Sequence, residues 1–549
     1  MKSPSSVLVA VAAGLALAAC AAPPQEPRSA SSPPLFETFG SLQRDIGTPV
    51  PAAQRYFDQG LRLAYGFNHE AAGRAFAEAA RLDPACAMCV WGQALVLGPN
   101  INLPMDAALA PEATRLARRA EALSGSARPA DHALIRALVA RYADPAPADR
   151  TPLDVAYADA MAEAARRFPE DDDIGALYAE AMMDLAPWSY WSRDGEPTGR
   201  TPQIVAALEG VLARNPRHIG AIHYYIHAVE ASRTPGRATV HADRLAELAP
   251  GSGHLVHMPA HVYLRTGRYH DATLANFAAS TADEAFLAVC RGTNGVYPLG
   301  YVPHNWHFAA LSAGLHGSRT LATRAAEQTA RRADLQQLDT LAFMQQFVVA
   351  PLYTQVRFGQ WDAIRAQAAA PATQPYPRAV WHFARGMADV RARQLDAAAS
   401  ELAALQALRA DPAIAKTVFG VNTAEGVLAV AEPMLRGELA LARGDTAAGL
   451  AALRAAATAE DALNYTEPAD WPLPVRPYLG EALLAAGRPA EAAAVYREDL
   501  ATLPENGWSL AGLARAQRAL GDRAGAIDTQ RRQATAWQWA DTPLVASRF

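Results

Sequence analysis

The histidines of this chain are concentrated in one stretch of the sequence. Ten of the fourteen lie within residues 218–307. In this stretch, His223 and His227 are four residues apart, and so are His257 and His261. Residues four apart on a helix share one face, and a helical pair of imidazoles is a common way to provide two ligands for one metal ion. Each pair therefore predicts part of a transition-metal site.

The two pairs repeat at a spacing that would bring them together. His223 and His257 are 34 residues apart, and His227 and His261 are also 34 apart. This is the period of the tetratricopeptide repeat, a helix–turn–helix unit that stacks into a solenoid. Equal positions in successive repeats lie side by side, about 8–10 Å apart between helix axes, so we expect the pairs to face each other. The residues inside the pairs, Y-Y-I and M-P-A, do not match, so the histidines repeat while their neighbours do not.

Pro259 lies between the members of the second pair. Proline fits only in the first turn of a helix or at a kink. A helix that begins near Met258 would place His257 at its start and distort the pairing with His261.

Three more histidines and one glutamate lie close to these pairs. The glutamate comes one turn after the first pair, one histidine comes three residues before the second pair, and two open the next expected helix. Taken singly, each histidine is more often a hydrogen-bonded or solvated residue than a ligand. Four in periodic register favour an ion such as Zn, Cu or Fe, and the sequence leaves the identity of the metal open. We predict that His223, His227, His257 and His261 bind one transition-metal ion, with Glu230, His254, His304 and His307 as further ligands or as hydrogen-bond partners of ligands.

Two other groups of residues have side chains that could take part in chemistry. Cys86 and Cys89 form a C-x-x-C string at the start of an expected helix. No β-α-β pattern suggests a redox domain around them, so a local disulfide or two buried thiols are the favoured interpretations, with metal binding as an alternative. Glu180 and Asp184 share a helix face and could form an acid/base pair, although a solvated acidic face is the favoured reading. The familiar hydrolase and nucleotide-binding strings are absent from the sequence.

The elements that must position these side chains are helices of a repeat array. Residues 60–84 combine a small residue before a turn, Gly66, with an aromatic residue, Phe76, and a closing Asp-Pro, as in a tetratricopeptide unit. The string G-x-x-x-x-A recurs, including at Gly487 and Gly521, which are again 34 residues apart. Amphipathic helical patterns separated by Pro- or Gly-containing turns fill the intervening sequence. We predict an all-α tetratricopeptide-repeat solenoid with the histidines on its concave wall.

Composition agrees with a large folded protein. The chain has 549 residues, 51% hydrophobic and 19% charged, with a formal net charge of −5. This length exceeds what one compact core usually organises. Basic residues are scattered rather than clustered, so we expect no nucleic-acid partner.

The N-terminus predicts export and a lipid anchor. A lysine and an apolar run precede Leu17-Ala18-Ala19-Cys20, which resembles a bacterial lipobox. The resemblance implies cleavage before Cys20 and its lipidation, and Ala21 favours the outer membrane of a Gram-negative cell, facing the periplasm. No other apolar run is long enough to span a bilayer, so the anchor is the expected membrane attachment.

Four regions are predicted along the chain. They are a signal peptide (1–19), a flexible tether (20–50), an N-terminal repeat region with the histidine-rich centre (51–310) and C-terminal tetratricopeptide repeats (311–549). Two functions compete for this architecture. The first is binding or scaffolding of a peptide or protein partner on an extended surface. The second is a metalloenzyme, hydrolytic or oxidative, that uses the histidine cluster as an open metal site.

Several strings together resemble a group of bacterial tetratricopeptide-repeat proteins. They include F-N-H-E-A-A (67–72), C-A-M-C-V-W-G-Q-A-L-V-L-G-P-N-I-N (86–102), A-E-A-M-M-D-L-A-P-W-S-Y-W (179–191), H-Y-Y-I-H-A-V-E (223–230), H-L-V-H-M-P-A-H-V-Y (254–263) and Y-V-P-H-N-W-H-F (301–308). The resemblance covers roughly residues 56–310. It implies the repeat fold and marks these segments as one unit, and it supplies no reaction.

Overall fold

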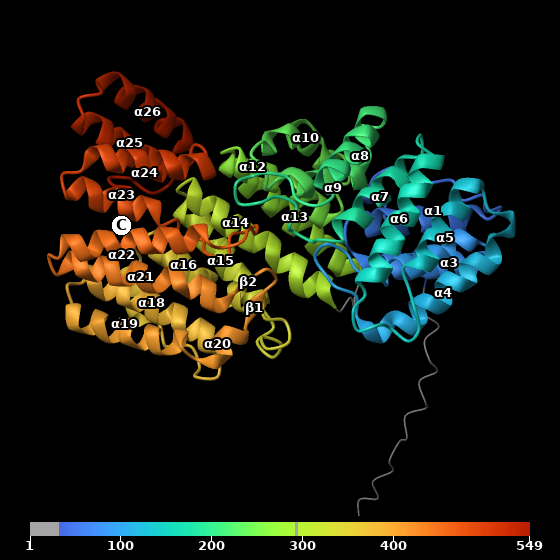
Figure 1. Ribbon diagram of the computed structural model, residues 1–549, viewed down its shortest axis with the longest axis horizontal. Coiled ribbons are helices and arrows are strands. Elements are labelled where there is room, and N and C mark those ends of the chain that lie inside the picture. Colours follow the sequence, from blue (N-terminus) through green and yellow to red (C-terminus); the bar gives the residue numbers. More distant parts are fainter. Residues whose placement is uncertain (1–31, 291–294) are drawn as a thin grey trace, which may run out of the picture.

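The computed structural model describes residues 32–290 and 295–549 (Figure 1). Cys20 and the predicted signal peptide lie outside the described residues. Among the described residues, the regular elements are helices and one short antiparallel hairpin, β1 (Val418–Phe419) with β2 (Asn422–Thr423). The prediction of an all-α repeat solenoid is confirmed.

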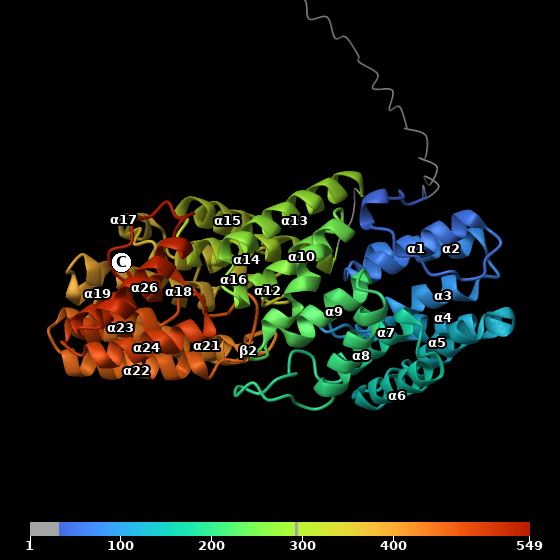
Figure 2. The same cartoon turned by 90° about the horizontal axis from the view of Figure 1, so that it is seen from above.

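Successive helices pack against one another from one end of the molecule to the other (Figure 2). The N-terminal helices lie at one end, α10 to α14 lie in the middle, and the C-terminal helices lie at the other end (Figure 1). The first half contains α1 (Pro51–Tyr65), α2 (His69–Leu82), α3 (Ala87–Leu95), α4 (Ala110–Leu123), α5 (Pro129–Ala140), α6 (Thr151–Arg167), α7 (Asp172–Met183), α8 (Thr201–Arg214), α9 (Ile219–Val229), α10 (Thr239–Leu248), α11 (Gly253–His257), α12 (Pro259–Arg265) and α13 (Tyr269–Val289). The second half contains α14 (Val302–Leu315), α15 (Arg319–Arg332), α16 (Met344–Arg357), α17 (Trp361–Ala366), α18 (Pro375–Arg391), α19 (Leu395–Arg409), α20 (Pro412–Lys416), α21 (Ala424–Ala442), α22 (Thr446–Asp461), α23 (Arg476–Ala485), α24 (Pro489–Thr502), α25 (Gly507–Ala519) and α26 (Arg523–Ala536). Short 3-10 turns η1 (Glu37–Phe39), η2 (Ala107–Leu109), η3 (Ser124–Ser126) and η4 (Pro235–Ala238), and a π turn η5 (Tyr297–Tyr301), complete the helical elements.

Local signals fix where many of these helices begin. The side chain of Asn68 accepts a hydrogen bond from the backbone N–H of Ala71 and caps α2. Asp445 and Asp522 cap α22 and α26 in the same way. Such caps satisfy amide groups that the first helical turn leaves without partners.

Glycines let the repeat helices approach closely around a buried aromatic ring. Phe76 of α2 lies between Gly60 of α1 and Gly92 of α3, where an added Cβ would lie 2.6 Å and 2.4 Å from the ring. In the C-terminal half, Tyr496 of α24 lies in the same way between glycines of α23 and α25, where a Cβ would come within 2.4 Å and 2.1 Å of it. The two halves of the chain therefore use the same packing device.

The segment before α1 packs against the repeats. Phe39 is 3% exposed and Arg44 is 6% exposed. The Arg44 guanidinium forms ion pairs with Asp131 at 2.8 Å and with Asp171 at 2.8 Å. The prediction of a flexible tether over residues 20–50 therefore does not hold for residues 32–50, because this part carries buried apolar and charged side chains that bind the fold.

The hydrophobic core is divided between the two halves. One large cluster of buried side chains runs from Phe39 to Val302, and a second runs from Val349 to Ala516. The predicted boundary between residues 310 and 311 falls inside α14, so this helix belongs to the connection between the halves rather than to one of them. Within residues 32–290 and 295–549, no helix combines the length and apolarity that a bilayer crossing requires.

Candidate metal centre

The histidine cluster lies where α9, α11, α12 and α14 meet. His223 and His227 project from α9, and His257 ends α11. Met258 separates α11 from α12, so the break expected from Pro259 is present, and His261 lies in the first turns of α12. His304 comes from the first turn of α14.

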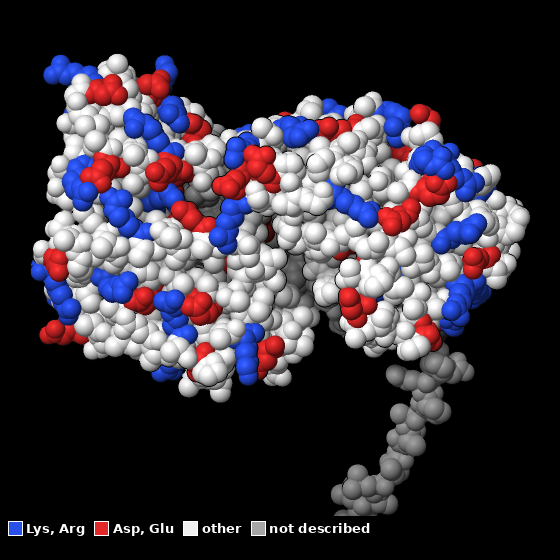
Figure 3. All heavy atoms as spheres, in the orientation of Figure 1, with Lys and Arg blue, Asp and Glu red and all other residues white. Residues whose placement is uncertain are grey.

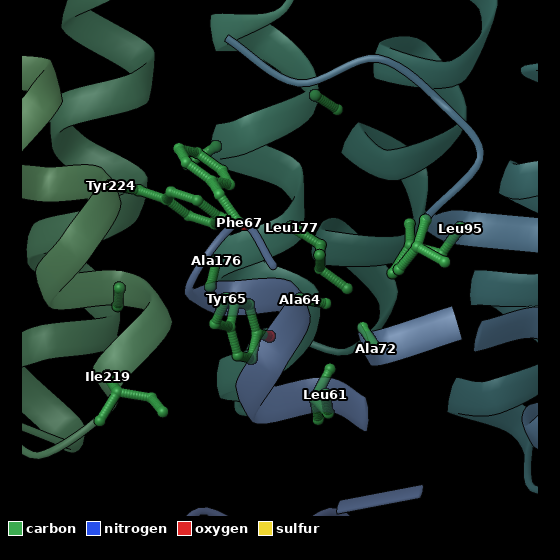
Figure 4. Close-up of a cluster of buried hydrophobic side chains, with 14 of the residues drawn as sticks. Leu61, Ala64, Tyr65, Phe67, Ala72, Leu95, Ala176, Leu177, Ile219 and Tyr224 are labelled. Atoms are coloured by element: carbon green, nitrogen blue, oxygen red, sulfur yellow. The ribbon is translucent and has the colours of Figure 1, made fainter. Parts of the chain in front are cut away.

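The cluster is buried. His223 and His257 have no exposed surface, and His227, His254 and His261 are at most 2% exposed, whereas His304 is partly buried. The prediction placed these histidines on the concave wall of the solenoid, and the structure buries their side chains among the helices. Aromatic rings lie against them, with centroids 4.5 Å apart for Phe67 and His223 and 4.8 Å apart for Tyr301 and His254. Figure 4 shows Tyr65, Phe67 and Tyr224 together in the apolar packing on this side of the molecule.

Each of four histidines has its Nδ1 atom against an oxygen acceptor. Nδ1 of His223 lies 2.6 Å from the backbone oxygen of Tyr65, and Nδ1 of His257 lies 2.6 Å from Oδ1 of Asn276. The Asn276 amide is oriented by its own donation to the Ala272 carbonyl. The Nδ1 atoms of the other two, His227 and His261, face the two oxygens of Glu230 at 2.7 Å and 2.5 Å.

These contacts decide which nitrogen is free to bind a metal. A carbonyl, amide or carboxylate oxygen accepts a hydrogen bond, so each facing Nδ1 carries the proton. In the neutral ring the Nε2 atom then presents a lone pair. Acceptors behind the ring that fix this tautomer are typical of metal-binding histidines.

One set of lone pairs meets at His257, His261 and His304. Nε2 of His257 lies 2.8 Å from Nε2 of His261 and 3.2 Å from Nε2 of His304. The nitrogens of this group all lie within 4.8 Å of one another. Two facing lone pairs repel unless a cation or an extra proton lies between them, so this geometry offers a place for a bound ion.

A second set meets at His223, His227 and His254, again with the nitrogens within 4.8 Å. Nε2 of His223 lies 3.1 Å from Nε2 of His254. Among the described residues, Nε2 of His227 and Nδ1 of His254 are buried without a hydrogen-bond partner. Buried polar atoms normally have partners, so this group has capacity for a ligand.

Glu230 joins the two groups from behind. Although burial opposes ionisation, His261 and His227 hold the pKa of Glu230 at about 2. The carboxylate in turn raises the pKa of His261 above its usual value, against the effect of burial. A third possible group of donors, His227, Glu230 and His261, consists of these same contacts. Glu230 is therefore placed as the hydrogen-bond partner of two ligands.

Burial and the neighbouring imidazoles keep the other rings neutral. Burial, followed by the charge of His227, lowers the pKa of His223 well below its usual range. Burial has the same effect on His254, His257 and His304, with further contributions from nearby histidines. Neutral imidazole is the form that binds a metal.

The grouping of the predicted ligands in the structure differs from the grouping expected from the sequence. The four histidines expected around one ion are divided between two groups, and His254 and His304 complete them. His307, three residues after His304, points elsewhere and packs against the ring of Phe347 at 5.5 Å. Positions three apart on a helix differ by about 60° around its axis, and on α14 this separates the two rings.

Four contributions to the site were not predicted. They are the Tyr65 carbonyl, Asn276 of α13, Phe67 in the turn between α1 and α2, and Tyr465 from the C-terminal half. Phe67 is in F-N-H-E-A-A, and its positive φ of 55° directs the ring against His223. This string is part of the resemblance described above, but nothing in its residues indicates a contact with α9.

The two other candidate groups have structural roles. The sulfur atoms of Cys86 and Cys89 are bonded to each other at the start of α3. Asp184 is not on a solvated face, because it pairs with the buried Arg141 at 2.5 Å. Glu180 is 5% exposed and lies 3.8 Å from the same guanidinium. The favoured reading of a solvated acidic face is therefore wrong.

The protein is an all-α tetratricopeptide-repeat solenoid with a histidine cluster in its interior, as the order of its helices, their packing and the buried donors show.

No protein-family model and no curated protein matches the chain. Solved structures similar to it include the human IFIT1 dimer with m7Gppp-AAAA, at 10% identity and TM-score 0.34, covering 89% of this chain and 91% of that chain. They also include the APC/C hetero-tetramer Cut9–Hcn1, at 13% identity and TM-score 0.32, covering 88% and 76%. Yeast Tom70 matches at 11% identity and TM-score 0.26, covering 89% and 92%.

Proposed function

We propose that this protein is a lipid-anchored, periplasm-facing tetratricopeptide-repeat protein that binds a transition metal in its histidine cluster and acts in binding or scaffolding. The observation that carries metal binding is the approach of the His257 and His261 Nε2 atoms to 2.8 Å, with the Nδ1 proton of each ring committed to another acceptor. His304 adds a third nitrogen. An all-imidazole donor set suits Zn, Cu, Fe or Ni better than Mg or Ca.

The anchor and the location rest on sequence alone. The string Leu17-Ala18-Ala19-Cys20 supports lipidation at Cys20, and the outer membrane is proposed from the alanine that follows it. Globomycin sensitivity of processing and labelling with a fatty-acid analogue test the anchor. Unlabelled protein, or a Cys20→Ala variant with unchanged processing, would contradict it.

A peptide or protein is the proposed partner, because stacked helical repeats form extended surfaces. Basic and acidic side chains are interspersed over the face shown in Figure 3, and the net charge is −5, which supports a partner other than nucleic acid. Crosslinking in envelope extracts followed by stoichiometric co-purification tests this proposal. Saturable binding of RNA at physiological salt would overturn it.

A metalloenzyme is the second candidate, and one observation favours it. The His257, His261 and His304 group offers three protein donors. Catalytic zinc sites keep three protein ligands and leave one position for water or substrate, whereas structural sites are filled by four. Hydrolysis or oxidation that is lost on chelation and restored by one metal would favour the enzyme.

Metal binding itself is tested on protein purified without its signal peptide and without a histidine tag. We expect near-stoichiometric metal and a melting temperature that falls when chelator removes it, because an ion that binds the folded state stabilises it. The double variant His257→Ala, His261→Ala should lose the metal held by the His257, His261 and His304 group. The matched control is His382→Ala, which removes a histidine from the C-terminal half where its ring contacts Glu401. If the wild-type protein takes up no metal and melts identically with chelator, the proposal fails.

A further inference from the structure

We infer that the histidine cluster is a dinuclear centre in which two transition-metal ions are each held by three histidine Nε2 atoms. This inference rests on the proposed metal binding and adds a second ion. The first ion belongs to His257, His261 and His304, and the second belongs to His223, His227 and His254.

The spacing within each group fits one ion. Nitrogens that bind a single ion at about 2.0–2.1 Å lie about 2.8–3.4 Å apart when the angle between them is near 90–110°. The measured Nε2 separations are 2.8 Å and 3.2 Å around His257, and 3.1 Å between His223 and His254. These separations therefore fit nitrogens that bind one ion in each group, and the remaining donors lie within 4.8 Å.

The second group has its own reason to hold a cation. The Nδ1 protons of His223 and His227 are committed to the Tyr65 carbonyl and to Glu230. Their Nε2 lone pairs consequently point into the group, and that of His227 has no partner among the described residues. A proton on His254 Nε2 could satisfy His223, but it would leave both His227 Nε2 and His254 Nδ1 unsatisfied. An ion bound by the three rings satisfies the Nε2 lone pairs of both His223 and His227 on α9.

Glu230 explains why there are two centres instead of one. Its carboxylate lies between the Nδ1 atoms of His227 and His261, so these two rings turn their Nε2 atoms away from it. Within residues 32–290 and 295–549, no set of mutually close donors combines His223 with His257. Glu230 is thus a positioning residue that holds the two groups at a fixed relation and supplies a negative charge behind both.

The donor chemistry limits which ions the centre would take. Six imidazoles, without a thiolate or a carboxylate ligand, suit Zn, Cu, Fe or Ni, and zinc and copper are the ions tested below. Each ion would have three protein ligands and an open position for water or another small ligand. The rings of the two groups are neighbours, with centroids 5.1 Å apart for His227 and His261 and 5.6 Å apart for His254 and His257. A small molecule that bridges two ions is therefore the expected ligand.

The number of ions decides the inference. Metal-free wild-type protein is titrated with Zn²⁺, with bound metal counted by mass spectrometry and by calorimetry. We expect two ions per chain in the wild type. We expect one ion in the double variant His223→Ala plus His254→Ala, and one in the double variant His257→Ala plus His304→Ala. The control His382→Ala should keep two. Folding of each variant is checked by circular dichroism.

The outcomes separate the two proposals. No bound Zn²⁺ and no bound copper in the wild type would overturn metal binding and the dinuclear centre together. One ion in the wild type, retained in His223→Ala, His254→Ala, would overturn the second ion and leave the first. Two ions retained in that variant would also overturn the assignment. If a variant fails to fold, Cu²⁺-loaded wild type decides: magnetic coupling between two ions in its electron paramagnetic resonance spectrum supports the centre, and an isolated single-copper signal contradicts it.

Discussion

The hydroxyl group of Tyr465 lies 3.2 Å from Oε2 of Glu230, although 235 residues separate them in the sequence. Tyr465 belongs to the segment between α22 and α23, and its hydroxyl also contacts the buried Glu467. The Arg265 guanidinium donates to the Thr502 carbonyl beside this contact. The C-terminal repeats therefore complete the environment of a carboxylate that orients two ligands on the N-terminal side.

Replacing Tyr465 tests whether this contact serves the metal centre. Tyr465→Phe removes one donor to Glu230, so we expect metal affinity to fall about three- to tenfold, at the lower end of what partners of ligands contribute. Competition with a chromophoric chelator measures it. Tyr376→Phe is the control, because that hydroxyl donates to Gln346 in the C-terminal half. Equal affinities for both variants would show that the contact is only structural.

Asn276 offers a test of the tautomer argument. Asn276→Leu keeps the shape of the side chain but removes the acceptor that faces Nδ1 of His257. The ring can then carry its proton on Nε2, and we expect metal affinity to fall about 10–100-fold. Thr273→Val, one turn earlier on α13, removes a buried hydrogen bond to Ser312 without touching an imidazole. If its effect on affinity equals that of Asn276→Leu, the orienting role of Asn276 is refuted.

Arg44 should anchor the segment that precedes α1. Arg44→Leu leaves three carboxylates without their buried partner, those of Asp131, Asp171 and Asp173. Breaking such a network costs about 3–5 kcal/mol. Urea denaturation measures the loss of unfolding free energy. Arg115→Leu breaks an exposed pair with Glu112 and should change stability by less than about 1 kcal/mol.

The glycines around the aromatic rings predict a packing cost. A Cβ at Gly512 would lie 2.1 Å from Tyr496, so Gly512→Ala should destabilise the C-terminal half by about 1–3 kcal/mol. Gly210 of α8 has only the far end of Arg214 nearby, at 3.9 Å. Gly210→Ala should therefore stabilise by about 0.5–1 kcal/mol, because alanine favours the helix. Thermal melting of both variants gives the comparison, and equal shifts would refute the packing argument.

Asp283 predicts a pH dependence of stability. Burial raises its pKa to about 7, although Tyr297 and Asn305 donate hydrogen bonds to it. The folded state therefore holds this proton more tightly than the unfolded state. This bound proton adds on the order of a few kcal/mol to the free energy of unfolding. The added stability is fully present below about pH 4 and is lost as the pH rises through about 7.

Asp283→Asn should reduce that loss of stability between pH 5 and pH 8. The new side chain is compatible with the site because Oδ1 of Asn305 has no partner among the described residues. When the Asn305 amide turns, this oxygen can accept a hydrogen bond from the amide introduced at position 283. Denaturation of metal-free protein at several pH values measures the slope. Glu284→Gln, at the exposed neighbouring position, is the control. Parallel curves for wild type and Asp283→Asn would contradict the assignment.

The sequence by itself determined the repeat fold and the candidate donors. The 34-residue spacing, the helix-breaking prolines and the recurring glycines are local signals, and they reach the structure directly because neighbouring repeats pack in sequence order. The registered pairs of α9, α11 and α12 follow from the same periodicity. The sequence also marks His254 and His304 as candidate donors, but it does not assign either of them to an ion.

Only the tertiary structure decided how these donors are grouped. The division into two sets depends on which ring nitrogen faces an acceptor, and those acceptors are a carbonyl of α1, an amide of α13 and a carboxylate placed between two helices. Spacing along one chain does not specify such contacts. The burial of the cluster and the approach of Tyr465 across 235 residues likewise arise when distant segments pack together. A periodic sequence can place side chains on a helix face, but the orientation of each imidazole is set by neighbours that the periodicity does not contain.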